Sequence, residues 1–375
     1  MRWAVRITAG DAVGHVFTDA RSLVAGRGEE CGLRVRDPDA SRAHCRFTIE
    51  PPHVGVRDLG SRNGTRVNGV VVDERELADG DEVRVGSTTL RITVAPAEFP
   101  GYALGHELGR GAQGVVFLAR DTTTGEPVAL KVLHDIRPDA TELVLREIAN
   151  VRALRHPNIV EFRGSGGDPV PFLVNAYCPG GSVDRRGRLT AGEAVPITLG
   201  VLAGLAYAHA AELPEVRLAD RTTTTARGLV HRDVTPRNVL LDGGVARVAD
   251  FGLAKAFALA GLSGHTRTGE VGGSLEFLPR AQVLNYRHAP PWVDVWAAAA
   301  TLYWMLTGRA PRDFPPGADP VAVVLREDPV PIRVREPAVP GPLAEVIDEI
   351  LADETPVSAG EFAATLGAVG PGPAG

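Results

Sequence analysis

The sequence contains very little lysine and cysteine, and it lacks a long hydrophobic run. Only two of its 40 basic residues are lysines, Lys131 and Lys255, and arginine supplies the rest. The three cysteines are few and scattered, which argues against a disulfide framework or a zinc site and predicts reduced thiols. The longest apolar run, residues 296–306, is too short to cross a bilayer and predicts a buried helix.

Charge and the N-terminal sequence exclude further classes. The net charge is −6 and neither half has a large basic excess, which argues against a nucleic-acid-binding protein. The first ten residues, MRWAVRITAG, lack the apolar segment of a signal peptide, so we expect a cytoplasmic protein without a membrane partner. The length of 375 residues exceeds that of one typical core and predicts two or three domains.

The two halves of the chain have different patterns. Residues 1–95 contain short alternating segments such as CRFTIE and DEVRV, separated by turn sequences such as GSRNG, which predicts an all-β sandwich. A short linker, 96–101, follows. From residue 102 a strand, a glycine-rich loop and further strands precede helical periodicity, which predicts an α+β fold to about residue 366 and a flexible tail at 367–375.

Three motifs of the first half occur in a fixed order. They are V-A-G-R at 24–27, S-R-A-H at 41–44 and D-L-G-S-R-N-G-T-R-V-N-G at 58–69. Together they resemble the forkhead-associated (FHA) domain, an eleven-stranded sandwich whose loops bind phosphothreonine peptides. Asn-Gly alone would indicate only a hairpin turn, so this prediction depends on the three motifs together.

The FHA resemblance implies a phosphothreonine site. Its residues would be Arg27, Ser41, Arg42, Arg62 and Asn63. Arg27 and Ser41 would hold the phosphate, and Asn63 would hold the peptide backbone. A phosphothreonine carries about −1.5 to −2 charges and three acceptor oxygens, which suits arginines and hydroxyl donors. We expect His44 to support the Ser41 loop instead of contacting the ligand.

A glycine-rich segment opens the second half. Gly109, Gly111 and Gly114 lie between two predicted strands, where glycine lets backbone N–H groups approach phosphates. Lys131 follows on the next predicted strand, at the end of Val-Ala-Leu-Lys. A planar guanidinium does not replace a compact ammonium. A lysine in a chain that otherwise uses arginine therefore indicates a specific role at this position.

Further motifs follow in a recognisable order. They are Glu147 in a predicted helix, His231-Arg232-Asp233 with Asn238, Asp250-Phe251-Gly252, and Asp294 in the predicted buried helix. Residues 102–366 therefore resemble bacterial Ser/Thr protein kinases of the eukaryotic-like family, with an N-lobe over about 102–178 and a C-lobe over about 179–366. The whole chain is predicted to be multidomain, with a β-sandwich followed by a bilobal kinase fold.

The kinase resemblance assigns catalytic roles. Lys131, held by Glu147, would bind the α- and β-phosphates of ATP, and Asn238 and Asp250 would bind Mg²⁺, with Mn²⁺ as the alternative metal. Asp233 would accept the proton of the substrate hydroxyl. The nucleotide site would comprise Leu108, Gly109, Arg110, Gly111, Ala112, Gln113, Gly114, Val116, Ala129 and Lys131.

Two positions depart from the family pattern. Thr235 stands where most Ser/Thr kinases have lysine, and Ala281 stands where the A-P-E segment has glutamate. Arg237 would restore the missing catalytic charge. In the alternative interpretation, Mg²⁺ and Lys131 would suffice at a lower rate. Thr235 would also hydrogen-bond Ser274, in place of the lysine–threonine link of the family. The arginine partner of the missing glutamate is absent too, which leaves the anchoring of the activation segment open.

These observations predict an ATP-dependent protein Ser/Thr kinase of cytosolic signalling that reads phosphothreonine. The alternative is a pseudokinase scaffold that binds phosphothreonine proteins without phosphotransfer, and a small-molecule kinase is a weaker third interpretation. Thr266 and Thr268 are candidate phosphorylation sites, and self-association through such threonines is a further hypothesis. An insertion at about 211–227, which contains RTTTTA at 221–226, is expected to be a loop with little apolar surface.

Overall fold

The structure is a computed structural model. It describes residues 3–9, 13–17, 21–96, 99–111, 114–133, 154–166, 171–217, 223–251, 275–285, 289–352 and 356–370. The chain divides into two compact units, one of residues 1–142 and 164–174 and the other of residues 143–163 and 175–375.

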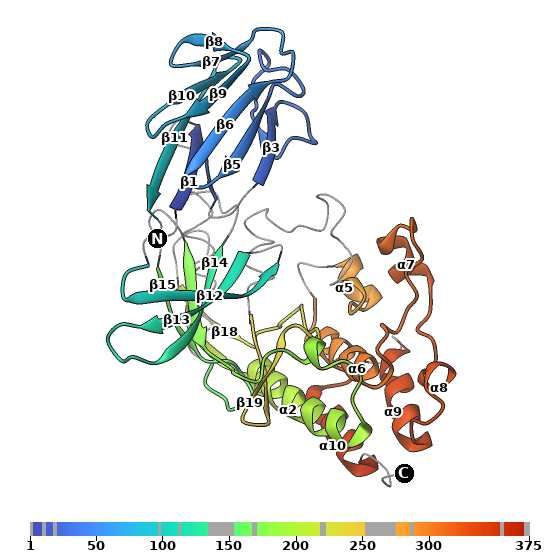
Figure 1. Cartoon of the computed structure of the whole chain (residues 1–375). Coiled ribbons are helices and arrows are strands. Elements are labelled where there is room, and N and C mark those ends of the chain that lie inside the picture. The colour runs from blue at the N-terminus through green and yellow to red at the C-terminus, as the bar shows by residue number, and fades with distance from the viewer. Residues whose placement is uncertain are drawn as a thin grey trace. The chain divides into compact units, whose positions relative to one another are not determined.

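The first 96 residues form two β-sheets (Figure 1). One has the order β2-β1-β11-β10-β7-β8 and contains β1 (Trp3–Ala9), β2 (Val13–Phe17), β7 (Thr65–Val67), β8 (Val70–Val72), β10 (Glu82–Val85) and β11 (Thr88–Pro96). The other has the order β4-β3-β5-β6-β9 and contains β3 (Arg21–Gly26), β4 (Leu33–Arg34), β5 (Cys45–Glu50), β6 (His53–Asp58) and β9 (Glu74–Leu77). Within the described part of the chain these eleven strands confirm the predicted sandwich.

Alternation along the strands forms the core of this sandwich. In β5 the residues Cys45, Phe47 and Ile49 are buried and the intervening residues are exposed, as expected for a strand with one face in the core. They pack in one cluster with residues of the other sheet, such as Val83 and Ile92. The V-A-G-R motif ends β3 with Arg27 directly after it, the S-R-A-H motif directly precedes β5, and the third motif begins at the end of β6 and continues through β7.

A five-stranded sheet begins the kinase-like part. Its order is β12-β13-β14-β16-β15, with β12 (Tyr102–Gly111), β13 (Gly114–Asp121), β14 (Pro127–Leu133), β15 (Phe162–Gly166) and β16 (Phe172–Ala176). Val115 and Phe117 of β13 pack with Val128 and Leu130 of β14 in one apolar cluster. Because side chains alternate along a strand, Val116, Ala129 and Lys131 share the opposite face.

The second unit is mostly helical. Its elements are η1 (Val183–Arg186), α2 (Ala191–Ala210), β17 (Glu212–Arg217), β18 (Thr223–Arg227), β19 (Val239–Asp242), β20 (Val245–Val248), α5 (Arg280–Leu284), α6 (Trp292–Thr307), α7 (Pro320–Arg326), α8 (Ile332–Arg335), α9 (Gly341–Leu351) and α10 (Ala359–Val369). The helices α2, α6, α9 and α10 pack around one core (Figure 1). Nearly every residue of α6 is buried, which confirms the predicted buried helix.

Helix α2 is the one helix, among those the structure describes, that is long and apolar enough to cross a membrane. Its residues Val201, Leu202 and Leu205 are buried in the core cluster, and α2 packs against α6 and α10. A core helix of a globular domain has the same length and composition. We therefore attribute its hydropathy to core packing.

The segment from His231 to Asn238 is the predicted catalytic loop, and the insertion before it corrects the sequence prediction. Instead of an irregular loop, its described residues form the antiparallel hairpin β17–β18. Threonine-rich segments suit extended strands because β-branched side chains pack well on a pleated surface. The two ends of the hairpin lie side by side at the end of α2. The Gly228 N–H donates to the Ala211 carbonyl at 2.8 Å, and the Leu229 N–H donates to the Ala208 carbonyl at 2.9 Å.

Candidate functional site

The predicted phosphothreonine residues are joined by hydrogen bonds between three loops. The Arg27 N–H donates to the Ser41 carbonyl at 3.0 Å, and the Arg62 N–H donates to Ser41 Oγ at 3.0 Å. The Asn63 side-chain amide donates to the Asp39 carbonyl at 2.9 Å. The loops after β3, before β5 and after β6 therefore meet in one cluster.

Gly26 permits the closest approach within this cluster. A Cβ atom at this position would lie 2.2 Å from the Arg42 carbonyl oxygen and 2.8 Å from that of Ser41. Both neighbours are backbone atoms, so a side chain at residue 26 would displace the Ser41 loop. Close packing against the Ser41 loop therefore requires glycine at this position of the V-A-G-R motif.

The polar groups of the cluster suit an anion. The side chains of Arg27, Arg42 and Arg62 are exposed, and none of them forms an ion pair with another described residue. Ser41 Oγ accepts from Arg62 and keeps its own O–H as a donor. Three guanidinium groups and a free hydroxyl donor are a suitable environment for a phosphate.

His44 is buried and connects two of the loops. Its Nδ1 accepts from the Ser41 N–H at 3.2 Å, so the ring proton lies on Nε2, which donates to the Gly64 carbonyl at 3.4 Å. His44 thus supports the Ser41 loop, as expected from the sequence.

Asp58 organises the loop that carries Arg62 and Asn63, and the sequence analysis missed it. Its carboxylate accepts from the N–H groups of Gly60, Ser61 and Thr65 and from both the Ser61 and Thr65 hydroxyls, at 2.6–3.1 Å. Burial opposes ionisation, but these hydrogen bonds outweigh it and lower the pKa of Asp58 from 3.8 to about 2. An Asp two residues before Gly, as in Asp58-Leu59-Gly60-Ser61, is typical of an Asx turn and was the available signal.

Asp37 holds the loop that contains Asp39, whose carbonyl accepts the hydrogen bond from Asn63. Its Oδ1 accepts from the Asp39 N–H, and its Oδ2 accepts from the N–H and hydroxyl groups of both Ser87 and Thr88 at 2.7–2.8 Å. Burial opposes ionisation here too, yet the hydrogen bonds hold the pKa of Asp37 far below its ordinary value. Partners fifty residues away left no local sequence signal.

The glycine-rich segment is the hairpin between β12 and β13. Gly109 pairs with Val116, and Gly111 pairs with Gly114. A Cβ at Gly114 would lie 2.1 Å from the Val132 carbonyl oxygen, so β13 and β14 approach too closely for any side chain there. Register irregularities between Leu104 and Gly109 bend β12 before the hairpin end.

One face of this sheet carries the predicted nucleotide residues. Val116 of β13 lies directly opposite Lys131 of β14, and Ala129 is two residues before that lysine on the same face. Lys131 is only 6% exposed. The Arg110 side chain forms an ion pair with Glu107 at 2.9 Å. The predicted site residues Ala112, Gln113, Glu147, Thr266 and Thr268, and also Ser274, lie outside the residues that the structure describes.

Asp294 of α6 fixes the start of the catalytic loop. Its buried carboxylate accepts from the His231 N–H and the Arg232 N–H, both at 2.7 Å, and from His209 Nε2 at 2.8 Å. Three donors on one carboxylate make a strong, charge-assisted anchor. The helix therefore sets the position of the residues that precede Asp233.

The His231 ring joins the catalytic loop to Asp250. Its Nδ1 accepts from the Asp233 N–H at 3.1 Å, and Nε2 donates to the carbonyl of Ala249 at 2.7 Å. The Phe251 ring meets the His231 ring edge-on with centroids 4.5 Å apart. The residues before and after Asp250 are thus both held by His231.

Asn238 lies next to Asp233. Its Nδ2 donates to the Asp233 backbone carbonyl at 2.8 Å and to Asp233 Oδ2 at 3.0 Å. The backbone carbonyl of Asn238 accepts from the Ala249 N–H at 2.8 Å. Arg232 and Asp250 adopt positive φ angles of 70° and 62°. Non-glycine residues rarely adopt this conformation, and such strain is concentrated at functional sites.

The donor set fits a divalent cation bound together with phosphate. Within the described residues no group of three or more His, Cys, Asp or Glu side chains converges on one point. Because Nδ2 of Asn238 is engaged by Asp233, its Oδ1 remains an acceptor, and Asp250 offers a carboxylate. Mg²⁺ prefers such oxygen ligands and takes one or two of them from the protein when phosphates supply others.

Thr235 is buried, and Arg237 lies at the surface of the catalytic loop. Arg237 is 75% exposed, with its Nε 3.7 Å from Asp184 Oδ2. Burial raises the pKa of the Glu276 carboxyl, and the positive charge of Arg237 opposes that rise. Arg237 therefore lies close enough to Glu276 for its positive charge to act on that carboxyl.

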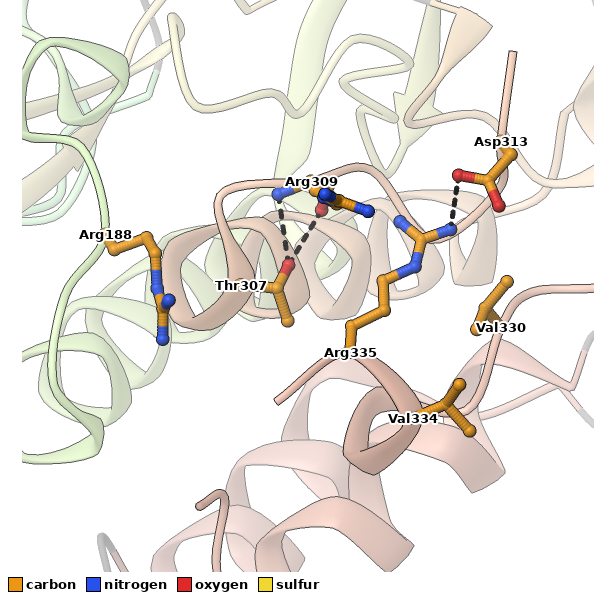
Figure 2. A pocket seen from close by; sticks show the side chains of 7 residues that line it. All are labelled: Arg188, Thr307, Arg309, Asp313, Val330, Val334 and Arg335. Atoms are coloured by element: carbon orange, nitrogen blue, oxygen red, sulfur yellow. Dashed lines mark hydrogen bonds and ion pairs between the residues drawn. The ribbon is translucent and has the colours of Figure 1, made fainter. Parts of the chain in front are cut away.

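A separate cavity of about 460 Å³ lies in the second unit, and none of the predicted site residues lines it. Its lining residues are Arg188, Thr307, Arg309, Asp313, Val330, Val334 and Arg335. Figure 2 shows the Arg335 guanidinium directed at Asp313, to which it donates at 2.9 Å. Arg188 pairs with Glu336. Two of the three lining arginines are thus already neutralised by acids of the protein.

Comparisons with known proteins agree with this division of the chain. A model of the FHA domain matches residues 23–86, and a model of the protein kinase domain matches residues 102–336. The chain therefore belongs to the protein kinase family, and it carries an FHA domain before the kinase domain. Both predicted resemblances and the predicted fold class are confirmed.

Relatives of this chain include bacterial Ser/Thr kinases. The chain is 31% identical over 267 residues to the serine/threonine-protein kinase PknB of Mycobacterium tuberculosis. This match covers 67% of this chain and 39% of PknB. It is 32% identical over 254 residues to the probable serine/threonine-protein kinase SCO3848 of Streptomyces coelicolor, covering 64% of this chain and 35% of that protein. The chain thus spans about two fifths of the length of these relatives.

A solved structure shows the same fold. The crystal structure of a mutant Mycobacterium tuberculosis PknI kinase domain is similar with a TM-score of 0.50 and 24% identity. The similarity covers 72% of this chain and 96% of that domain. At this identity the likeness concerns the fold alone.

Proposed function

We propose that this chain is an ATP-dependent protein Ser/Thr kinase that uses its FHA domain to bind phosphothreonine proteins in cytosolic signalling. The observation that carries the proposal is the connected set formed by Asp233, Asn238 and the residue before Asp250. A scaffold without chemistry has no need of strained backbone at Arg232 and Asp250. The intact set therefore favours the enzyme over the pseudokinase.

The proposed reaction transfers a phosphoryl group to a protein hydroxyl. ATP with a divalent cation supplies the phosphoryl group and neutralises its charge. Asp233 orients the hydroxyl and accepts its proton, and Asn238 holds the Asp233 carboxylate in place. Lys131 and the β12–β13 hairpin bind the phosphates, and Asn238 Oδ1 and Asp250 hold the metal. Phosphoryl transfer depends mainly on such positioning and charge neutralisation.

The kinase proposal is tested with the full chain, labelled ATP and Mg²⁺ or Mn²⁺. We expect label in the protein and in a general Ser/Thr substrate, and none with Asp233→Asn, which keeps the size of the side chain but cannot accept the proton. Equal labelling of both proteins, or of neither, would favour the pseudokinase. Adding Lys131→Met separates loss of nucleotide binding from loss of chemistry.

For the FHA domain we propose that Arg27 and Ser41 hold the phosphate, that Asn63 holds the peptide backbone, and that Arg42 and Arg62 add charge. The exposed guanidinium groups and the Ser41 hydroxyl support these roles. Titration of the full chain with phosphothreonine, phosphoserine and unmodified versions of one peptide tests them. We expect binding of the phosphothreonine peptide and its loss in Arg27→Ala. Equal binding of the unmodified peptide would contradict the assignment.

We further propose that phosphothreonines on a second copy of the chain are among the ligands of the FHA domain. Thr266 and Thr268 are the candidates from the sequence. Light scattering should show that the autophosphorylated chain associates and that phosphatase treatment or Arg27→Ala dissociates it. Association that survives both treatments would have another cause.

A further inference from the structure

The short helix α5 contacts the catalytic loop through one buried side chain. Gln282 is 1% exposed, and its Nε2 donates to the Arg232 carbonyl at 2.7 Å. Arg232 is the strained residue with a φ of 70°, and it directly precedes Asp233. A buried side-chain amide thus bonds to the backbone at the residue before the proposed catalytic base.

The peptide between Arg232 and Asp233 is held at both ends. Its carbonyl accepts from Gln282, and its N–H, which belongs to Asp233, donates to His231 Nδ1 at 3.1 Å. Because a peptide unit is planar, two opposed hydrogen bonds fix its orientation. The Arg232 N–H is fixed as well, by Asp294 Oδ1 at 2.7 Å. Strained conformations persist only when their surroundings determine them in this way.

Arginines attach α5 to the rest of the second unit, although Ala281 replaces the usual glutamate. Arg280 donates to the Glu327 carbonyl at 2.9 Å and to Asp328 Oδ1 at 2.7 Å. Arg312, which is 2% exposed, donates to the carbonyls of Leu278 and Glu327 at 3.1 and 2.9 Å. Its guanidinium also lies over the Trp296 ring, 4.8 Å from the centroid.

These contacts give a continuous connection from α7 and the loop after it, through α5, to the catalytic loop. A change at Gln282 would remove this buried donor from the Arg232 carbonyl, and the loss of a buried hydrogen bond is costly. The peptide would then rotate, and the Asp233 carboxylate would move with it.

We propose that Gln282 is a positioning residue for phosphoryl transfer, which sets the orientation of Asp233 by holding the Arg232 carbonyl. The proposal rests on the proposed kinase activity. It makes the end of the activation segment a direct support of the catalytic base, through a hydrogen bond instead of through the missing glutamate.

Two nearly isosteric substitutions test the donor. Gln282→Met removes it at all pH values. Gln282→Glu removes it only while the carboxylate is ionised, because a protonated carboxyl donates through its O–H, and burial raises the pKa of such a group. We expect kcat to fall about tenfold to a hundredfold in both variants at about pH 8, with KM for ATP within about twofold of wild type.

The pH profile separates positioning from general damage to the fold. Relative to wild type, kcat of Gln282→Glu should recover as the pH falls from about 8 to about 6, and kcat of Gln282→Met should stay low throughout. Leu284→Ala changes a neighbouring side chain of α5 that is 74% exposed and is expected to keep wild-type kcat. Equal, pH-independent losses in all three variants would overturn the proposal.

Hydrogen–deuterium exchange of the catalytic loop gives a second measurement that does not require activity. In the full chain, peptides covering residues 229–238 should exchange faster in Gln282→Met than in wild type or Leu284→Ala. Unchanged exchange together with unchanged kcat would overturn the inference. If wild type and Asp233→Asn are equally inactive, the proposed function fails, and faster exchange in Gln282→Met still supports the positioning contact.

Discussion

At the scale of single residues, a carboxylate outside each candidate site holds that site's loop in place. Asp58 gathers five donors around the loop of Arg62 and Asn63, and Asp294 gathers three around the start of the catalytic loop. A carboxylate only accepts hydrogen bonds when ionised, so it can satisfy several N–H and O–H groups of one loop. The candidate residues of both sites depend on these carboxylates for their positions.

Asp58→Asn is predicted to loosen the loop between β6 and β7, which carries Arg62 and Asn63. The new NH₂ group would face N–H or O–H donors in place of an acceptor, so we expect a loss of about 1.5–3 kcal/mol in local stability. We also expect about tenfold weaker binding of a phosphothreonine peptide. Exchange of peptides over residues 58–67 in the full chain measures the loosening. Asp73→Asn, whose side chain is exposed, is the control and should behave as wild type.

The same residue gives a pH prediction. Because the pKa of Asp58 is lowered from 3.8 to about 2 in the folded protein, its ionised form stabilises the fold. That contribution is complete above about pH 4 and is lost as the pH falls through about 2. The stability difference between wild type and Asp58→Asn should therefore shrink from about pH 4 to about pH 2. A constant difference over this range would contradict the assignment.

Arg237 is the predicted source of the positive charge that Thr235 does not provide. Arg237→Gln should lower kcat by about tenfold to a hundredfold, because transition-state charge loses a cation, and Arg237→Lys should keep most of the rate. Initial rates at saturating ATP measure the effect. Arg326→Gln, at an exposed position of α7, is the matched control for loss of one surface charge. Wild-type rates in Arg237→Gln would favour Mg²⁺ and Lys131 as sufficient.

At the scale of elements, the sequence was informative where a local pattern determines the structure. The alternation of β5 and the apolar run of α6 predicted a core strand and a buried helix, and both are confirmed. Motif order predicted the two domain families. The hairpin β17–β18 was missed because its polar residues resemble a loop. Asp37 with Thr88, and Gln282 with Arg232, were missed because each pair lies about fifty residues apart in the chain.

Helix α2 contains a glycine whose role is packing. A Cβ at Gly204 would lie 2.8 Å from the Asn158 carbonyl oxygen, which belongs to the backbone and cannot easily move. Glycine normally weakens a helix by about 1 kcal/mol relative to alanine. Gly204→Ala should nevertheless destabilise the second unit by about 1–3 kcal/mol, because overpacking forces the backbone apart.

Chemical denaturation followed by circular dichroism measures this loss. Gly192→Ala is the control in the same helix, because a Cβ there would meet its nearest neighbour at 3.8 Å. We expect that substitution to be neutral or stabilising by less than about 1 kcal/mol. Stabilisation by both substitutions would mean that α2 lies farther from Asn158.

At the scale of the whole molecule, the extent of the kinase domain stays a prediction. The family match ends at residue 336, whereas the sequence predicts a domain to about 366. Two helices lie beyond the match. Leu343 and Ile347 of α9 and Phe362 and Leu366 of α10 are almost completely buried in the core that α2 and α6 also form. We expect these helices to be integral to the fold.

A chain that ends at residue 336 should therefore fail to fold as a kinase domain. Full burial of one large apolar side chain contributes about 1.5–3 kcal/mol, so the loss of four such residues is comparable to the whole stability of a typical domain, about 5–15 kcal/mol. A chain that ends at residue 370 keeps both helices and is the control. Cooperative unfolding and nucleotide binding by the shorter chain, with the midpoint of the control, would place the boundary at 336. Loss of both properties in the shorter chain alone would extend the domain through α10.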